Sequence, residues 1–222
     1  MLASTMRASM RRLPVLLAAL GLSLAGAHAE TATSAVRTGT ARNGAASIAY
    51  TDRGHGPSIV IAPSLGRGCA DFDDLGARLA AAGLRIVCPE PRGIGASTGP
   101  LDDPTLHLFA ADLAAVIAAA HLAPTVVLGH AYGNTVVRTL AADHPELVRG
   151  IILITASGRA PLSPETVAAI NQSSDLTLPE SQRLAALAAA YFAPGNDASA
   201  WLGGWYPKAQ AAQWAASKRS PP

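Results

Sequence analysis

The segment VVLGHAYGN, residues 126–134, constrains the fold more than any other part of the chain. An apolar run typical of a buried parallel strand stops at Gly129, and a helical pattern begins at Gly133. A strand that turns so sharply into a helix strains the backbone of its central residue and crowds the neighbouring residues. Glycines at 129 and 133 remove the side chains that would collide. The sequence therefore predicts a tight strand-to-helix turn with Ala131 at its centre.

Short apolar runs alternate with helical periodicity through the first two thirds of the chain. We expect a hairpin from residues 36–41 and 46–54, buried strands at 58–63, 84–90, 125–129 and 150–156, and helices at 71–83, 106–121 and 133–144. In the first of these helices, Asp71 is expected to cap the start and Gly83 the end. This alternation predicts an α/β protein with a mostly parallel, doubly wound sheet covered on both faces.

Beyond Ser157 the alternation stops, and residues 161–215 are rich in alanine with prolines between short helical segments. We therefore expect a core domain over 30–160, in which the later strands of the sheet are absent, and a helical cap segment over 161–222. Aromatic residues gather in the second half of the cap between Tyr191 and Trp214. They either line a pocket for an apolar substrate or pack against the edge of the sheet, and we favour packing.

The first 29 residues have the organisation of a secretory signal peptide. Three arginines precede the apolar run 13–27, which ends in Ala27-His28-Ala29. We predict cleavage after Ala29 and export to the periplasm or the exterior. A membrane anchor is the alternative, but the run is short for a bilayer and no later stretch is long and apolar enough to span one. No stable membrane span is expected after cleavage.

Removal of this segment changes the charge and the redox setting of the chain. It takes away three of the 17 basic residues and none of the 15 acidic ones, so the formal net charge moves from +2 to −1. Nucleic-acid binding therefore loses its electrostatic support. An exported protein can form disulfides, so Cys69 and Cys88 are either bridged or remain two small buried thiols.

Three motifs give the chain a family resemblance. Residues 62–68, APSLGRG, follow the first buried strand; residues 89–97 read PEPRGIGAS; and residues 129–133 read GHAYG. In order and spacing these are similar to the oxyanion loop, the Pro-Asp-x-Arg-Gly-x-Gly-x-Ser loop and the Gly-x-Ser-x-Gly nucleophile elbow of the α/β-hydrolase superfamily. The resemblance covers residues 36–156, and residues 157–222 look like the start of the family's helical cap.

The resemblance implies an α/β-hydrolase fold and hydrolysis of small esters or related carbonyl substrates. The helix that follows the elbow points its free amide groups at the site. We expect the backbone N–H groups of Leu65 and Tyr132 to form an oxyanion hole, which needs no serine.

The chain departs from the family pattern at the catalytic groups. The resemblance implies a nucleophile at 131, where alanine has no lone pair, and a late histidine, whereas no histidine follows His144. After the strand at 150–156 the first carboxylate is Glu165. We expect an inactive or impaired hydrolase that takes a small acyl or apolar ligand. The alternatives are a pseudoenzyme that only binds such a ligand, or a fragment that self-associates through the exposed strand 150–156.

The other candidate groups are expected to be structural. No Cys, His or Asp spacing resembles a metal site, and RGIGAS lacks the lysine of a phosphate-binding loop, so we expect neither a metal nor a cofactor. The expected roles are packing for His130, a loop hydrogen bond for Ser64, surface positions for His107 and His121, a contact with its own helix end for His144, and a salt bridge, in preference to a substrate contact, for Arg92.

Overall fold

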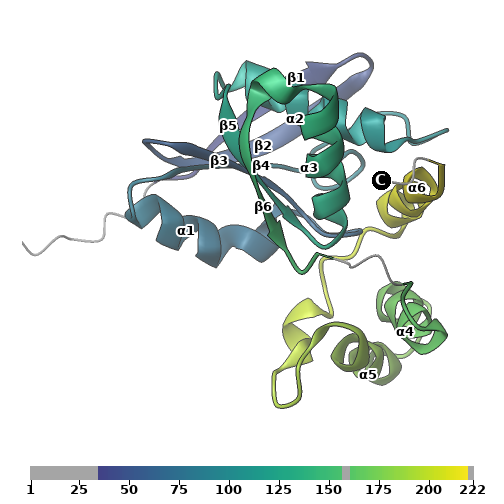
Figure 1. Ribbon diagram of the computed structural model, residues 1–222. Helices are drawn as coiled ribbons and strands as arrows, with labels where there is room; N and C mark the ends of the chain where they lie inside the picture. Colours follow the sequence, from purple (N-terminus) through teal and green to yellow (C-terminus); the bar gives the residue numbers. More distant parts are fainter. Residues whose placement is uncertain (1–34, 157–160, 220–222) are drawn as a thin grey trace, which may run out of the picture. The chain divides into compact units, whose positions relative to one another are not determined.

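The computed structural model describes residues 35–156 and 161–219, so the predicted signal segment 1–29 lies outside the described residues. Six strands form one sheet in the order β1-β2-β4-β3-β5-β6 (Figure 1). The strands are β1 (Arg37–Asn43), β2 (Ala46–Gly54), β3 (Ser58–Ala62), β4 (Arg85–Pro89), β5 (Thr125–His130) and β6 (Val148–Ile154). The β1–β2 hairpin is antiparallel and β2 runs antiparallel to β4, while β4, β3, β5 and β6 are mutually parallel. The predicted mostly parallel sheet is confirmed.

Helices cover the two faces of the sheet. Helices α2 (Leu106–Ala119) and α3 (Tyr132–Asp143) pack on one face and α1 (Asp73–Ala81) on the other (Figure 1). Each face of the sheet has its own apolar core, and alternate residues of the central strands point into one or the other: Val60 faces α2 and α3, and Ile61 faces α1. Because both faces are buried, the central strands are continuous apolar runs in the sequence.

The start of α1 differs from the prediction. A short 3₁₀ turn covers Cys69–Phe72, and α1 begins only at Asp73. Asp71 does not cap the helix, because both its oxygens accept hydrogen bonds from Arg67, at 2.8 and 2.6 Å. A charge-assisted bidentate pair is stronger than a single cap hydrogen bond. Gly83 lies just past the helix end with a φ of +86°, as expected of a C-terminal glycine.

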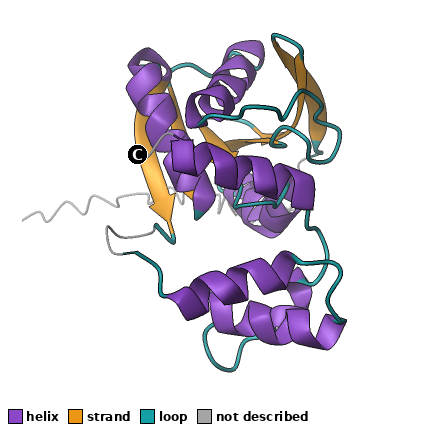
Figure 2. Ribbon diagram, turned by 90° about the vertical axis from the view of Figure 1, so that its right-hand side faces the viewer, coloured by secondary structure: helices purple, strands orange, loops and turns teal. Residues whose placement is uncertain are grey.

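The edge of the sheet at β6 is apolar and exposed. Ile151, Ile152 and Leu153 are 40%, 41% and 45% exposed, and β6 has a neighbour on one side only (Figure 2). In register with β5, Ile151 and Leu153 share the face that carries α3, whereas Ile152 is on the α1 face. Soluble proteins usually cover such an edge.

The remaining helices follow β6. Helices α4 (Pro164–Ser174) and α5 (Glu180–Tyr191) pack together as a pair, followed by a 3₁₀ turn η3 (Ala198–Trp201) and helix α6 (Pro207–Arg219) (Figure 2). Ala212 and Ala216 of α6 belong to the same core cluster as α2 and α3. Within residues 35–156 and 161–219, none of the helices has the length and apolar character needed to cross a bilayer.

The cap aromatics pack on one another. Tyr191, Phe192, Trp201 and Trp205 lie with ring centroids 5.5 to 6.5 Å apart. Leu187, also buried, completes this cluster. The four rings therefore pack, as favoured, but they pack mainly on one another and not against the edge of the sheet; among the described residues, Trp201 alone of the four has a ring contact with a strand residue, His130.

Candidate active site

The predicted elbow is present, with Ala131 at its centre. Ala131 connects β5 to α3 with φ 49° and ψ −110°, a conformation that L residues rarely adopt. A Cβ at Gly133 would lie 2.1 Å from the carbonyl oxygen of Ala62, and one at Gly129 would lie 2.6 Å from the backbone of Asn134. The two glycines are therefore required by the close approach of strand, turn and helix, as the sequence indicated.

The loop after β3 and the elbow after β5 begin side by side, because Ala62 and Gly129 are paired in adjacent parallel strands. Tyr132 is the first residue of α3, where an amide has no acceptor within the helix. In the part of the chain that the structure describes, neither the Tyr132 amide nor the Leu65 amide donates to a protein acceptor. Both are left as donors, and the Tyr132 amide lies at the positive end of the α3 dipole.

A disulfide and a buried carboxylate anchor the loop after β3. Cys69 and Cys88 are bonded, so the bridged alternative is confirmed and the loop is tied to the end of β4. The amide of Cys69 donates to Glu90 Oε2 at 3.1 Å. Burial raises the pKa of Glu90; the hydrogen bond from Cys69 opposes this shift, and the nearby Asp71 adds to it.

The third motif, residues 89–97, is also held by internal contacts. Ser97 Oγ donates to the carbonyl of Glu90 at 2.8 Å and accepts from the amide of Ala49 at 2.9 Å. Arg92 forms a bidentate pair with Asp112 at 3.0 and 2.7 Å, and both side chains are more than nine-tenths buried. The expected structural role of Arg92 is confirmed.

Arg67, which the sequence reasoning missed, joins the loop after β3 to the cap. Besides its pair with Asp71, its guanidinium lies 4.9 Å from the ring centroid of Trp201 and 4.8 Å from that of Trp205. It also donates to the carbonyl of Gly203 at 2.5 Å, and its side chain is only 3% exposed. An arginine between two glycines with an aspartate four residues later was the available signal.

The histidines lie outside any catalytic arrangement among the described residues. His130 packs edge-on against Phe72 and Trp201, with ring centroids 5.8 and 6.2 Å away, which confirms its packing role. Burial lowers its pKa, and Asp71 partly opposes that shift. His107 lies on the surface, where its Nδ1 is 2.7 Å from Asp143, and His121 is exposed as expected.

Two further predictions on polar side chains can be compared with the structure. The imidazole of His144 lies 3.5 Å from the carboxylate of Glu146 in the following turn, and the contact with its own helix end is made by its backbone amide, which donates to the Leu140 carbonyl at 2.8 Å. Ser64 is buried and its backbone carbonyl accepts from the Arg67 amide at 3.2 Å, but the expected side-chain bond is not found among the described residues. No set of three metal-ligating side chains occurs within residues 35–156 and 161–219.

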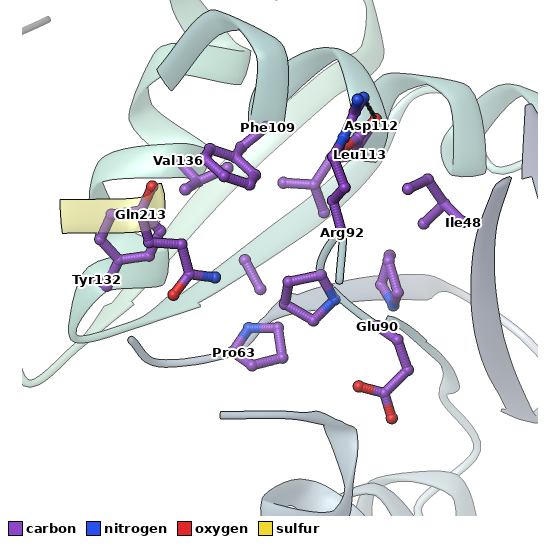
Figure 3. Close-up of a pocket in the computed structure, with 13 residues that line it drawn as sticks. Ile48, Pro63, Glu90, Arg92, Phe109, Asp112, Leu113, Tyr132, Val136 and Gln213 are labelled. Carbon is purple, nitrogen blue, oxygen red and sulfur yellow. Dashed lines mark hydrogen bonds and ion pairs between the residues drawn. The ribbon is translucent and has the colours of Figure 1, made fainter. Parts of the chain in front are cut away.

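A small, mostly apolar cavity of about 30 Å³ lies beside the elbow (Figure 3). Tyr132, Pro63, Phe109 and Glu90 are among its lining residues, together with Gln213 of α6. The hydroxyl of Tyr132 is buried without a hydrogen-bond partner in the described part of the chain, and burial raises the pKa of this phenol strongly. This volume has room for about two water molecules.

Comparison with known proteins gives the same fold. The sequence model of a family described as alpha/beta hydrolase fold matches residues 57–201. An esterase from Exiguobacterium antarcticum is similar in structure, with a TM-score of 0.63 at 20% identity over 77% of this chain and 69% of the esterase.

Two curated relatives match shorter parts of the chain. Protein ABHD8 of Bos taurus is 31% identical over 91 residues, which are 40% of this chain and 21% of that protein. A putative carbamate hydrolase, RutD of Klebsiella pneumoniae, is 32% identical over 111 residues, 50% of this chain and 41% of RutD. The chain thus covers less than half the length of these relatives.

Proposed function

Because the chain belongs to the alpha/beta hydrolase fold family, we propose that its elbow binds a small carbonyl compound and does not cleave it through a covalent intermediate. The observation that carries this proposal is the methyl group of Ala131 at the strained centre of the elbow. A methyl group has no lone pair, so the nucleophilic step of the family reaction has no attacking atom, whatever lies beyond residue 222.

The donors around Ala131 support binding. The amides of Leu65 and Tyr132 belong to the backbone, so they remain when the serine is absent. Two such donors, one in the loop after β3 and one at the N-terminus of α3, stabilise a carbonyl oxygen, each contributing about 0.5–1.5 kcal/mol to a neutral acceptor. In the best-studied hydrolases, loss of the triad leaves roughly 10³–10⁴-fold acceleration over water. We expect any hydrolysis by this chain to stay at or below that level.

Export is part of the same proposal. The signal-like segment 1–29 and the Cys69–Cys88 bridge both support an oxidising compartment outside the cytoplasm. Expression of the full chain, followed by mass spectrometry of the mature protein, should give an N-terminus at Glu30. A stable cytoplasmic product that retains residues 1–29 would contradict export.

Two measurements on the purified protein test the function. With p-nitrophenyl butyrate in rapid mixing, we expect no stoichiometric burst of p-nitrophenol, because no acyl-enzyme can form at Ala131. With butyramide and butyrate in titration calorimetry, we expect saturable binding of at least one compound.

A matched pair of variants assigns that binding to the loop. Leu65→Pro removes the amide donor and should abolish binding, whereas Leu65→Ala loses the side chain but keeps the donor. A burst equal to the enzyme concentration would overturn the non-catalytic proposal. If both Leu65 variants bind the compound equally well, the Leu65 amide does not take part in binding.

A further inference from the structure

Helix α6 places two buried glutamines against the loop that precedes the proposed site. Gln210 is 6% exposed and Gln213 is 1% exposed. The Gly66 amide donates to Gln213 Oε1 at 2.7 Å, and the Gly66 carbonyl accepts from the Tyr206 amide at 3.0 Å. Gln210 Nε2 donates to Ser174 Oγ at 2.8 Å. Buried carboxamides are costly unless paired, so the Gln213 bond fixes α6 on the loop and the Gln210 bond fixes it on α4.

The Gln213 contact has the chemistry of a bound ligand. Its side chain ends in a primary carboxamide, and the carbonyl oxygen of that group accepts from the amide next to Leu65, in a buried bond. Figure 3 shows this carboxamide in the space between Tyr132 and Pro63, and Gln213 lines the same cavity as both. A carbonyl compound entering the cavity beside Tyr132 would therefore meet the Gln213 side chain.

The surroundings favour a neutral carbonyl group over a carboxylate. Glu90 and Asp112 both line the cavity, and the lining cation Arg92 is fully paired with Asp112. Because the Arg92–Asp112 pair is neutral overall, an added carboxylate would approach the acidic group of Glu90 with no free cation among these described lining residues. A carboxamide avoids that repulsion and keeps the carbonyl oxygen that backbone amides bind.

We propose that Gln213 is an internal ligand of this site, and that the external ligand it excludes is a small primary carboxamide. This inference rests on the proposed function, because it assumes that the loop amides bind carbonyl groups. The Gln213 carboxamide competes with the external ligand, and α6 must leave Gly66 before that ligand enters. Such competition weakens the apparent affinity by the fraction of molecules in which the site is open.

Shortening Gln213 tests the proposal, with propionamide as the probe in titration calorimetry on the folded chain. Gln213→Ala removes the internal carboxamide and should bind propionamide at least tenfold more tightly than the wild type. Gln213→Asn keeps the polar group but is one methylene shorter, so it should also bind more tightly and serves if the alanine variant does not fold. Gln182→Ala, an exposed glutamine on α5, is the matched control and should keep the wild-type affinity.

The outcomes separate this inference from the proposed function. If the wild type and both Gln213 variants bind propionamide equally well and saturably, Gln213 is not an internal ligand, and the proposed function stays intact. Binding of propionate but not propionamide would overturn the ligand class alone. No binding of either compound by any variant would overturn both. Tighter binding of propionamide confined to the Gln213 variants supports the inference.

Discussion

Replacing Arg67 with alanine should destabilise the protein more than any single change on the surface of the chain. The substitution leaves the carboxylate of Asp71, which is only 14% exposed, without its bidentate partner. Removing one member of a buried ion pair costs about 3–5 kcal/mol, and the partial exposure of Asp71 places the effect near the lower end. Loss of the guanidinium from the faces of Trp201 and Trp205 adds about 1–2 kcal/mol. We therefore expect a loss of about 4 kcal/mol in the free energy of unfolding.

Equilibrium urea unfolding followed by tryptophan fluorescence measures this loss directly. The folded variant should also emit at longer wavelength, because Trp201 and Trp205 become more exposed to water once Arg67 is removed. The chain carries a matched control in Arg78 and Asp74, which have the same spacing on α1 but are 77% and 80% exposed. Arg78→Ala should leave the unfolding curve almost unchanged, because exposed ion pairs contribute little.

A result within error of Arg78→Ala would refute the reasoning, since the Arg67 pair differs from the Arg78 pair in its burial and in its contacts with Trp201 and Trp205. A double-mutant cycle provides a second check. If Arg67 acts mainly through Asp71, then Asp71→Ala should recover part of the loss in the Arg67→Ala background, because no buried carboxylate is left unpaired.

Four further changes have expected outcomes. Reducing the Cys69–Cys88 bond, which spans 19 residues, should lower the free energy of unfolding by about 3 kcal/mol, measured as a shift of the urea midpoint with and without reductant. Glu90→Gln should become more stable relative to the wild type as pH rises from 4.5, the ordinary pKa of a glutamate, to neutrality, because a carboxyl with a raised folded-state pKa costs stability as it ionises. A difference in melting temperature that does not change with pH would contradict this. We propose that a second copy of the chain pairs with β6, so the wild type should be a dimer in sedimentation equilibrium and Leu153→Lys should lower its mass. A monomeric wild type would refute the pairing. Ala131→Gly should raise the free energy of unfolding by about 1 kcal/mol because glycine tolerates a φ of 49°, and a lower melting temperature would contradict the strain.

The elements that could be predicted from the sequence are those whose cause is local. The elbow depends on Gly129, Ala131 and Gly133, three residues within one turn, so its steric requirements can be recognised from the sequence. The strand at 125–130 is recognisable because burial on both faces produces a continuous apolar run. The hairpin of β1 and β2 follows from two short runs separated by a tight turn.

The contacts that were missed join distant parts of the chain. Gln213 meets Gly66 across 147 residues, and Arg67 meets Gly203 across 136. The alanine-rich sequence of α6 gives little indication of which face is buried, so periodicity could not place Gln213 in the core. The predicted cap at Asp71 is wrong for a local reason: Arg67, four residues earlier, donates to both carboxylate oxygens.

The geometry of the elbow is a property of the fold and does not depend on the nucleophile. Ala131 keeps a positive φ although it has no catalytic atom to present, because its amide donates to the carbonyl of Ile154 at 3.0 Å and its carbonyl accepts from Asn134 at 3.1 Å. The close contact of Gly133 with Ala62 fixes the following helix in the same position. Strain of this kind persists where the surrounding structure imposes it. An alanine at the elbow therefore leaves the loop amides and the helix dipole in place, which is what the proposed carbonyl binding requires.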